Sequence, residues 1–144
     1  MSSALLDAGG DVYALGKKGR HSWKVGIKDP RGEGILGYVE VEDLAVMGSG
    51  DYERFFIQDG KRYHHIFNPA TGYPTEGVAS VTIIYPDPVI AQAWTKIPFI
   101  MGAEKGLKAL ESIPGMEVFI ITTSGEKFYS TGLKHAMNVV SETQ

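Results

Sequence analysis

Apolar and polar residues alternate along much of the chain, with the period of two that is typical of a half-buried strand. Glycine, asparagine, aspartate and proline residues separate the alternating segments, as turns between strands require. Val78–Tyr85 is largely apolar, which indicates a strand buried on both faces. The other predicted strands are the two parts of Leu5–Leu15 on either side of Gly9-Gly10-Asp11, Trp23–Ile27, Gly37–Glu42, Arg54–Ile57, Arg62–Phe67, Val118–Ile121 and Lys127–Tyr129.

Two short turns join neighbouring strands into hairpins. Asp59-Gly60 separates the first pair, and this dipeptide favours the tight turn of a β-hairpin. Ser124-Gly125 separates the last pair in the same way. The segment 68–74, Asn-Pro-Ala-Thr-Gly-Tyr-Pro, consists mostly of turn-forming residues and predicts a loop after the first hairpin.

The apolar spacing changes to that of a helix after residue 86. Asp87 stands where an N-cap residue belongs, and Pro88 occupies the first helical position. A buried helix is predicted for Val89–Met101, and we expect Pro98 to kink it because proline removes one backbone donor. A second helix is predicted for Glu104–Ser112. Strands, then two helices, then further strands indicate an α+β fold.

The composition is that of one packed domain, which we expect to span residues 1–144 with a frayed tail at 134–144. Hydrophobic residues make up 43% of the 144 and charged residues 22%, which argues against collagen, coiled coil and intrinsic disorder. The formal net charge of −3 leaves no basic excess, so no nucleic-acid partner is expected.

Because cysteine is absent, disulfides and thiolate chemistry are excluded. No segment reaches the roughly 18 apolar residues of a membrane span, and residues 1–7 carry no export signal.

Two turns carry residue types that suit a ligand. The bare backbone amides of Gly9 and Gly10 can approach a phosphate beside Asp11, although a plain turn capped by Asp11 explains the same residues. Ser49 and Asp51, in the string Ser-Gly-Asp-Tyr after a strand, can present a hydroxyl and a carboxylate to a ligand. The alternative for this second segment is a turn held by the aspartate side chain.

Adjacent histidines stand at the end of the first hairpin. Neighbouring strand residues point to opposite faces, so His64 and His65 cannot readily bind one metal ion together. One of them should face the interior or a site, and the other solvent. A histidine that leads into the 68–74 loop can act as a general base, although a structural histidine is the simpler reading of either residue alone.

Four strings taken together resemble one protein family. They are AGGDVYALG, WKVGIKDPRG, SGDYERFF and DGKRYHHIFNPATGYP, and they follow one another in this order. In that order they resemble the C-terminal half of the ApbE family, the FAD:protein FMN transferases once called thiamine biosynthesis lipoproteins. The resemblance extends over residues 4–133. It implies an α+β fold related to the T-fold, with an antiparallel sheet and two consecutive helices, of which this chain forms the C-terminal half.

The resemblance also implies an activity. A Ser or Thr hydroxyl of a target flavoprotein attacks the FMN phosphorus of FAD, AMP leaves, and Mg²⁺ at the diphosphate assists. Some members hydrolyse FAD to FMN and AMP instead. The family is commonly periplasmic or anchored to the inner membrane. The alternative for this chain is a non-catalytic flavin-binding or interaction half-domain.

The family's site residues fall on named positions of this chain. His65 matches the proposed catalytic histidine, and Asp11 matches a residue of the flavin site. Tyr63 shares a strand face with His65 and is expected to support it. With the two turns described above, the expected cofactor-binding set is Gly9, Gly10, Asp11, Ser49, Asp51, His65, Ile66, Asn68, Thr71 and Gly72.

The metal positions of the family are substituted in this chain. Where the family has an Asp and, four residues later, a Thr or Ser, this sequence has Gln92 and Lys96. A neutral amide is a poorer Mg²⁺ ligand than a carboxylate, and an ammonium repels the ion. Either the site is degenerate, or the Lys96 ammonium replaces the metal ion at the diphosphate. Thr95 stands one residue before the position of the family's metal-binding Thr or Ser. A kink in the helix at Pro98 can turn Thr95 towards the metal position.

The resemblance covers only part of the family's length. A half-fold would expose apolar surface or sheet edges. We therefore expect self-association, or pairing with a separate chain that supplies the missing N-terminal half.

Overall fold

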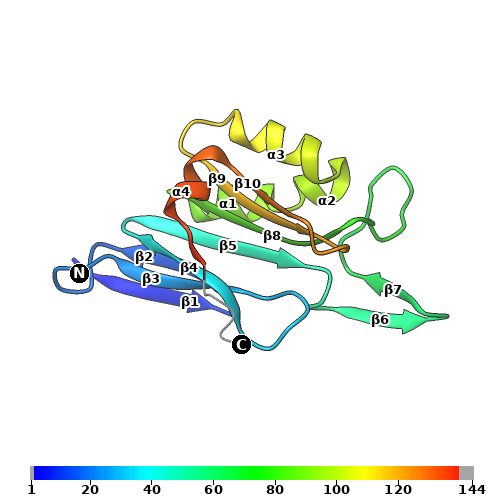
Figure 1. Ribbon diagram of the computed structural model, residues 1–144, viewed down its shortest axis with the longest axis horizontal. Helices are drawn as coiled ribbons and strands as arrows, with labels where there is room; N and C mark the ends of the chain where they lie inside the picture. Colours follow the sequence, from blue (N-terminus) through cyan, green and yellow to red (C-terminus); the bar gives the residue numbers. More distant parts are fainter. Residues whose placement is uncertain (1, 140–144) are drawn as a thin grey trace.

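The computed structural model describes residues 2–139, which form three layers. A large antiparallel sheet lies in the middle, with helices on one face and a smaller sheet on the other (Figure 1). A separate two-stranded hairpin projects from one end of this arrangement (Figure 1). The α+β class expected from the sequence is therefore confirmed.

The large sheet has the strand order β1-β2-β5-β8-β9-β10, and every neighbouring pair is antiparallel. Its central strands are buried on both faces, and this explains why Val78–Tyr85 lacks strict alternation. The strands are β1 (Ala4–Ala8), β2 (Asp11–Leu15), β5 (Leu44–Gly50), β8 (Val78–Tyr85), β9 (Glu117–Thr122) and β10 (Lys127–Tyr129).

The smaller sheet contains β3 (Trp23–Lys28), β4 (Ile35–Val41) and β11 (Asn138–Val139) in the order β11-β4-β3. The frayed tail expected from residue 134 is wrong as far as Val139, because α4 (Thr131–Ala136) and β11 occupy this segment. Two carboxylates, from Glu111 and Glu117, accept backbone N–H bonds near the start of α4. Residues 140–144 lie outside the described part of the chain.

The projecting hairpin consists of β6 (Phe55–Gln58) and β7 (Lys61–His64), as the sequence predicts. Asp59 and Gly60 form its turn, and both have positive φ, of 51° and 76°. This backbone matches the twist of a two-residue hairpin and explains the Asp-Gly sequence.

Three helices follow β8 where the sequence predicts two. The expected helix at 89–101 is broken into α1 (Pro88–Trp94) and α2 (Ile97–Met101), and α3 (Ala103–Glu111) follows. Pro98 lies in the first turn of α2, where a proline costs no helical hydrogen bond, so the chain breaks before it instead of bending through it. Asp87 caps α1 as predicted, because its Oδ1 accepts from the amides of Val89 and Ile90.

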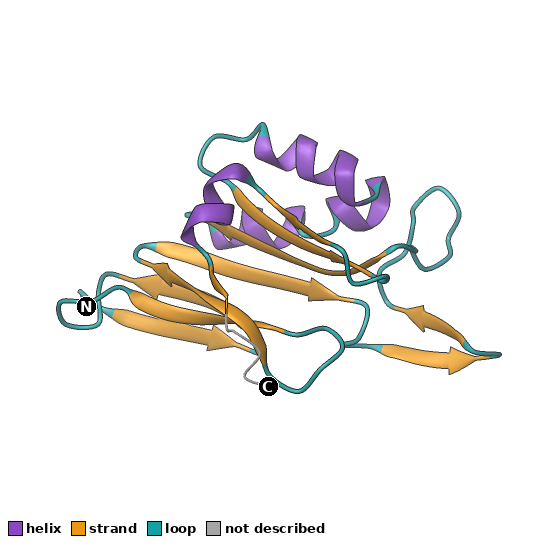
Figure 2. Cartoon of the chain, viewed as in Figure 1, coloured by secondary structure: helices purple, strands orange, loops and turns teal. Residues whose placement is uncertain are grey.

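Helices α1, α2 and α3 lie on one side of the large sheet (Figure 2). Leu133 of α4 instead packs in the core on the other side, with the smaller sheet. α1 packs against β5 and β8, and α3 packs against β9. None of the helices within residues 2–139 has the length and apolar character that a bilayer-spanning segment needs.

Apolar side chains form one core on each face of the large sheet. Val118 and Ile120 of β9 pack beneath the helices, while Phe119 and Ile121 pack against the smaller sheet. This division follows the period of two in the strand. The central strands β5, β8 and β9 thus contribute side chains to both cores.

Candidate functional site

His64 and His65 separate as the alternation predicts. His64 is buried, and its Nε2 lies 2.8 Å from the carbonyl oxygen of Thr75, while its Nδ1 accepts from the amide of Ile66. His65 is exposed beyond the end of β7. His64 therefore holds the hairpin to the following segment, and the imidazole of His65 remains accessible.

A cavity of about 600 Å³ lies beside His65, and we call it the aromatic cavity. Phe56 and Tyr63 stack in parallel on one side of it, with their ring centroids 5.1 Å apart. Tyr63 thus lines the same cavity as His65, as expected from the shared strand face. The full lining is Arg54, Phe55, Phe56, Tyr63, His64, His65, Phe67, Gly72, Tyr73 and Pro74. Such a cavity suits a flat, aromatic ligand.

The 68–74 loop closes on itself beside the aromatic cavity. Asn68 accepts backbone bonds from Thr71 and Gly72 through its carbonyl oxygen, and from Ala70 through its Oδ1. Gly72 has a φ of 71°, which favours glycine there. Gly72 lines the aromatic cavity, while Asn68 and Thr71 line a neighbouring one. Ile66 is buried in the core beneath the helices, so it supports this loop from inside.

The Gly9-Gly10 turn opens onto a second cavity of about 320 Å³, which we call the polar cavity. The plain-turn interpretation expected Asp11 to cap this turn, but Asp7 does so, since its Oδ1 accepts from the amide of Gly10 at 2.8 Å. Asp11 instead reaches β5 and α1, where it accepts from the amide of Gly48 and from Nε2 of Gln92. Asp11 thus belongs to the cavity and not to the turn.

Five polar residues form a connected group that we call the lysine cluster: Asp11, Ser49, Gln92, Thr95 and Lys96. The ammonium of Lys96 lies 2.7 Å from Gln92 Oε1, 2.9 Å from the Gln92 carbonyl oxygen and 2.9 Å from Thr95 Oγ1. Ser49 belongs to β5 itself and does not follow it, and its hydroxyl lies 2.8 Å from Thr95 Oγ1. Thr95, at the break between α1 and α2, therefore belongs to the lysine cluster.

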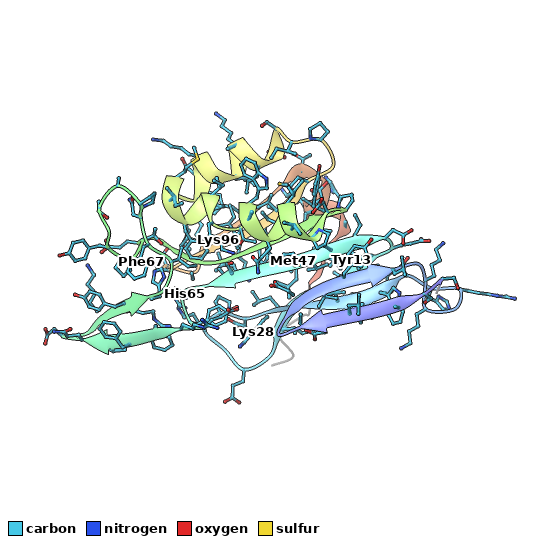
Figure 3. The ribbon with its side chains drawn as sticks, turned by 180° about the vertical axis from the view of Figure 1, so that it is seen from behind. Tyr13, Lys28, Met47, His65, Phe67 and Lys96 are labelled. Carbon is cyan, nitrogen blue, oxygen red and sulfur yellow. The ribbon has the colours of Figure 1, made fainter. Side chains whose placement is uncertain are left out.

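The lysine cluster lies between two cavities. Asp11 and Gln92 line both the polar cavity and a third cavity of about 480 Å³, which Lys96 also lines. Lys96 and Met47 lie between His65 and Tyr13 in the view of Figure 3. Burial lowers the pKa of Lys96, while the carboxylates of Asp11 and Glu53 act in the opposite direction.

The carboxylate of Asp51 is bound by two arginines. Asp51 is only 2% exposed, and Arg31 donates to its two oxygens at 2.7 Å each. Arg62 lies 3.9 Å from Asp51 Oδ1. The hydrogen bond to Asp51 raises the pKa of Arg31, so this guanidinium stays charged. The two partly exposed arginines thus neutralise the buried carboxylate of Asp51, which the sequence predicts to face a ligand.

The residues at the family's metal positions do not fit Mg²⁺. An ammonium ion already bonds the oxygens of Gln92 and Thr95, and a divalent ion beside it would be repelled. Asp11 supplies the one carboxylate of the lysine cluster, and its oxygens accept from Gly48 and Gln92. Within residues 2–139 no cluster of three or more His, Asp or Glu side chains is present.

Three contributors to these sites were not identified from the sequence. Arg31 stands in the Asp-Pro-Arg-Gly string, and its pairing with Asp51 joins residues 20 positions apart. The sequence predicts Phe56 and Tyr73 only as strand and loop residues, but both line the aromatic cavity. The exposed aromatic residues around His65 were the available signal, since large apolar side chains on a polar hairpin are unusual.

Comparisons with known proteins identify the family. The ApbE family model matches residues 1–120. A FAD:protein FMN transferase of Treponema pallidum is 39% identical over 97% of this chain, and one of Klebsiella pneumoniae is 35% identical over 91%.

Solved structures agree with this assignment. The ApbE protein of Thermotoga maritima superimposes with a TM-score of 0.84 at 41% identity, covering 93% of this chain and 44% of that one. The apo flavinyl transferase ApbE of Pseudomonas stutzeri gives a TM-score of 0.74 at 28% identity, covering 94% of this chain and 43% of that one. The chain spans 42% and 41% of the length of the Treponema and Klebsiella proteins. The polypeptide therefore belongs to the ApbE family.

Proposed function

We propose that this chain binds FAD and transfers its FMN moiety to a hydroxyl group of an acceptor flavoprotein. The observation that carries the proposal is the exposed imidazole of His65 at the edge of an aromatic cavity of about 600 Å³. The isoalloxazine ring is flat and aromatic, and the stacked pair Phe56 and Tyr63 suits one of its faces. Membership of the family supports the same assignment.

The polar cavity receives the phosphate-bearing part of the ligand in this proposal. It is lined by Gly9, Gly10, Asp11 and Ser49, and by Lys28 on β3. The amide of Gly10 already donates to Asp7, so phosphate binding relies on the other groups of this cavity. The positive charge of Lys28 attracts an anionic ligand to the opening.

His65 acts as the general base. The acceptor hydroxyl oxygen bonds to the FMN phosphorus, and the bond from this phosphorus to the bridging oxygen of the diphosphate breaks. AMP leaves with the bridging oxygen, and the hydroxyl proton moves to the imidazole of His65. Phosphoryl transfer of this kind depends mainly on positioning and charge neutralisation. When water replaces the hydroxyl, the same step yields FMN and AMP.

A second function is favoured by one observation. All three hydrogens of the Lys96 ammonium are directed at protein oxygens, and the residues around it do not fit Mg²⁺. A chain without this ion can retain flavin and yet transfer nothing. The alternative is therefore a non-catalytic flavin-binding module.

Two measurements separate these functions. Flavin fluorescence during FAD titration reports binding, and chromatography reports AMP released from FAD. For the transferase we expect both signals, and His65→Ala should abolish AMP release while the exposed-histidine control His21→Ala retains it. Binding without AMP release favours the module, and the absence of both contradicts the proposal.

The pH profile tests the role of His65 separately. Imidazole side chains change charge between about pH 5 and 8, and only the neutral ring accepts a proton. The rate of AMP release should therefore rise with pH across this interval. A flat rate would remove His65 as the base.

We also propose self-association through the exposed apolar surface of β1, α1 and α2. Leu6 is 62% exposed, Val89 is 77% exposed and Met101 is 46% exposed. Covering such side chains is favourable in water. Light scattering at micromolar concentration should give a mass above that of the monomer, and a sharp monomer peak would contradict self-association.

A further inference from the structure

The lysine cluster contains a complete set of matched donors and acceptors. A protonated lysine has three N–H donors, and Lys96 has three oxygens within 2.9 Å. Two of them belong to Gln92 and the third is Thr95 Oγ1. The ammonium therefore occupies an oxygen cage in the way that a bound cation would.

The remaining atoms of the lysine cluster fit this arrangement. Thr95 is fully buried and donates its single hydroxyl hydrogen to the carbonyl oxygen of Gln92 at 2.7 Å. The hydroxyl of Ser49 then donates to Thr95 Oγ1, which also accepts from Lys96. The side-chain amide of Gln92 is fixed in one orientation, because its oxygen faces the ammonium and its nitrogen faces Asp11.

Charge is balanced across the same group. The Gln92 amide joins the positive charge of Lys96 to the negative charge of Asp11. A divalent ion could enter the cage only if the covalently attached Lys96 side chain first moved out of it. The carboxylate of Asp11 would then face the divalent ion in place of the ammonium. The cage is closed to a free ion as long as Lys96 remains in it.

We propose that the Lys96 ammonium is the permanent cation of this site and replaces the divalent metal ion that the family resemblance implies. The inference depends on the proposed function in one respect, namely that the bound ligand is a flavin dinucleotide. The three ammonium hydrogens of Lys96 already bond to protein oxygens. Lys96 therefore attracts the diphosphate through its positive charge and not through hydrogen bonds. Flavin binding is consequently independent of divalent ions in this chain.

The first test needs no flavin and uses Mn²⁺ as the probe. Electron paramagnetic resonance of Mn²⁺ titrated with the wild-type chain should show the free ion only, because the cage is filled. The double variant Gln92→Asp/Lys96→Thr empties the cage and adds a carboxylate, so it should bind Mn²⁺. Lys108→Thr, which replaces an exposed lysine on α3, is the matched control and should bind none. Mn²⁺ binding to the wild type overturns the inference.

The second test uses FAD, with EDTA or with Mg²⁺. The affinity of the wild type should be the same in both, and Lys96→Met should lower it about tenfold, whereas Lys108→Met should not. A tenfold gain in affinity on adding Mg²⁺ to the wild type overturns the inference and leaves the proposed function standing. Absence of FAD binding in every condition removes the proposed function, and the Mn²⁺ measurement then decides the role of Lys96 by itself.

Circular dichroism of each variant separates misfolding from a local effect. If the double variant is folded and binds no Mn²⁺, the cage is not a cation site and the inference fails. If the double variant does not fold, the wild-type responses to Mn²⁺ and to Mg²⁺ still decide the question.

Discussion

The guanidinium of Arg31, in the loop after β3, binds both carboxylate oxygens of Asp51, which follows β5. The pair joins the smaller sheet to the large one at the end that carries the hairpin β6–β7. The Asp51 side chain is 3% exposed and that of Arg31 is 41% exposed, so the carboxylate is the partner that depends on the bond. An Asp51 carboxylate left without Arg31 would be a nearly unpaired buried charge.

Replacing Arg31 by alanine should lower the free energy of unfolding by about 1–3 kcal/mol, because a buried acceptor loses its donors. Arg62 remains as a weaker partner at 3.9 Å. Urea denaturation measures the change. Lys24→Ala, which removes an exposed ion pair with Glu40, is the control and should cost at most about 0.5 kcal/mol. Equal effects of the two substitutions would show that Asp51 does not depend on Arg31.

The two adjacent histidines should respond differently to substitution by alanine. His64→Ala removes a buried ring and its bond to Thr75, so it should cost about 1–3 kcal/mol of stability. His65→Ala changes an exposed residue and should cost less than about 0.5 kcal/mol. Thermal unfolding followed by circular dichroism compares them. A larger loss for His65→Ala would contradict the orientation of this hairpin end.

Gly106→Ala should destabilise the protein although the position is helical. Alanine normally favours a helix over glycine by about 0.8–1 kcal/mol. A Cβ at Gly106 would lie 2.5 Å from the Cα atom of Pro98, which belongs to the backbone of α2. The expected net loss is about 1–3 kcal/mol, as for other overpacked sites. Urea denaturation tests it, with the exposed Lys105→Ala on the same helix as the neutral control. A gain in stability would mean that α2 and α3 are less tightly packed.

Acid should weaken the anchoring of α4 through Glu111. Hydrogen bonds from the Thr131 hydroxyl and amide lower the pKa of Glu111 below its ordinary value of 4.5. Because the folded-state pKa is the lower one, this stabilisation is present above pH 4.5 and disappears as the pH falls through the lowered pKa.

Glu111→Gln should therefore lower the melting temperature at pH 7, and the difference from the wild type should shrink towards pH 3. Glu126→Gln removes one carboxylate from a turn and controls for net charge. A difference that stays constant with pH would contradict this role of Glu111.

Local patterns predicted much of this fold. The opposite directions of His64 and His65 follow from the period of two, and the tight hairpin turn follows from Asp59-Gly60. Asp87 caps α1 because its side chain reaches amides two and three residues ahead. Each of these features depends on residues that are close in sequence.

The features that the sequence did not predict depend on distant partners. The helix break at Thr95 is stabilised by Ser49, which lies 46 positions earlier on another strand. The start of α4 is stabilised by the carboxylates of Glu111 and Glu117, which lie outside the helix. The sequence of residues 131–136 alone therefore does not predict a helix. The sequence shows that Asp51 could bind a ligand, but it does not show that Arg31 occupies both oxygens of its carboxylate. The polarity of such residues is visible in the sequence, but their partners are not.

The pairing of β11 with β4 has a consequence for synthesis on the ribosome. Asn138 pairs with Tyr38, so the smaller sheet joins residues separated by most of the described chain. Strands β3 and β4 are translated before β11 and can form their own ribbon, but its third strand arrives only when residues 138–139 have been translated. The nascent chain thus carries an unprotected β4 edge in the interval between the synthesis of β4 and that of β11, and this edge is where we expect chaperones to bind.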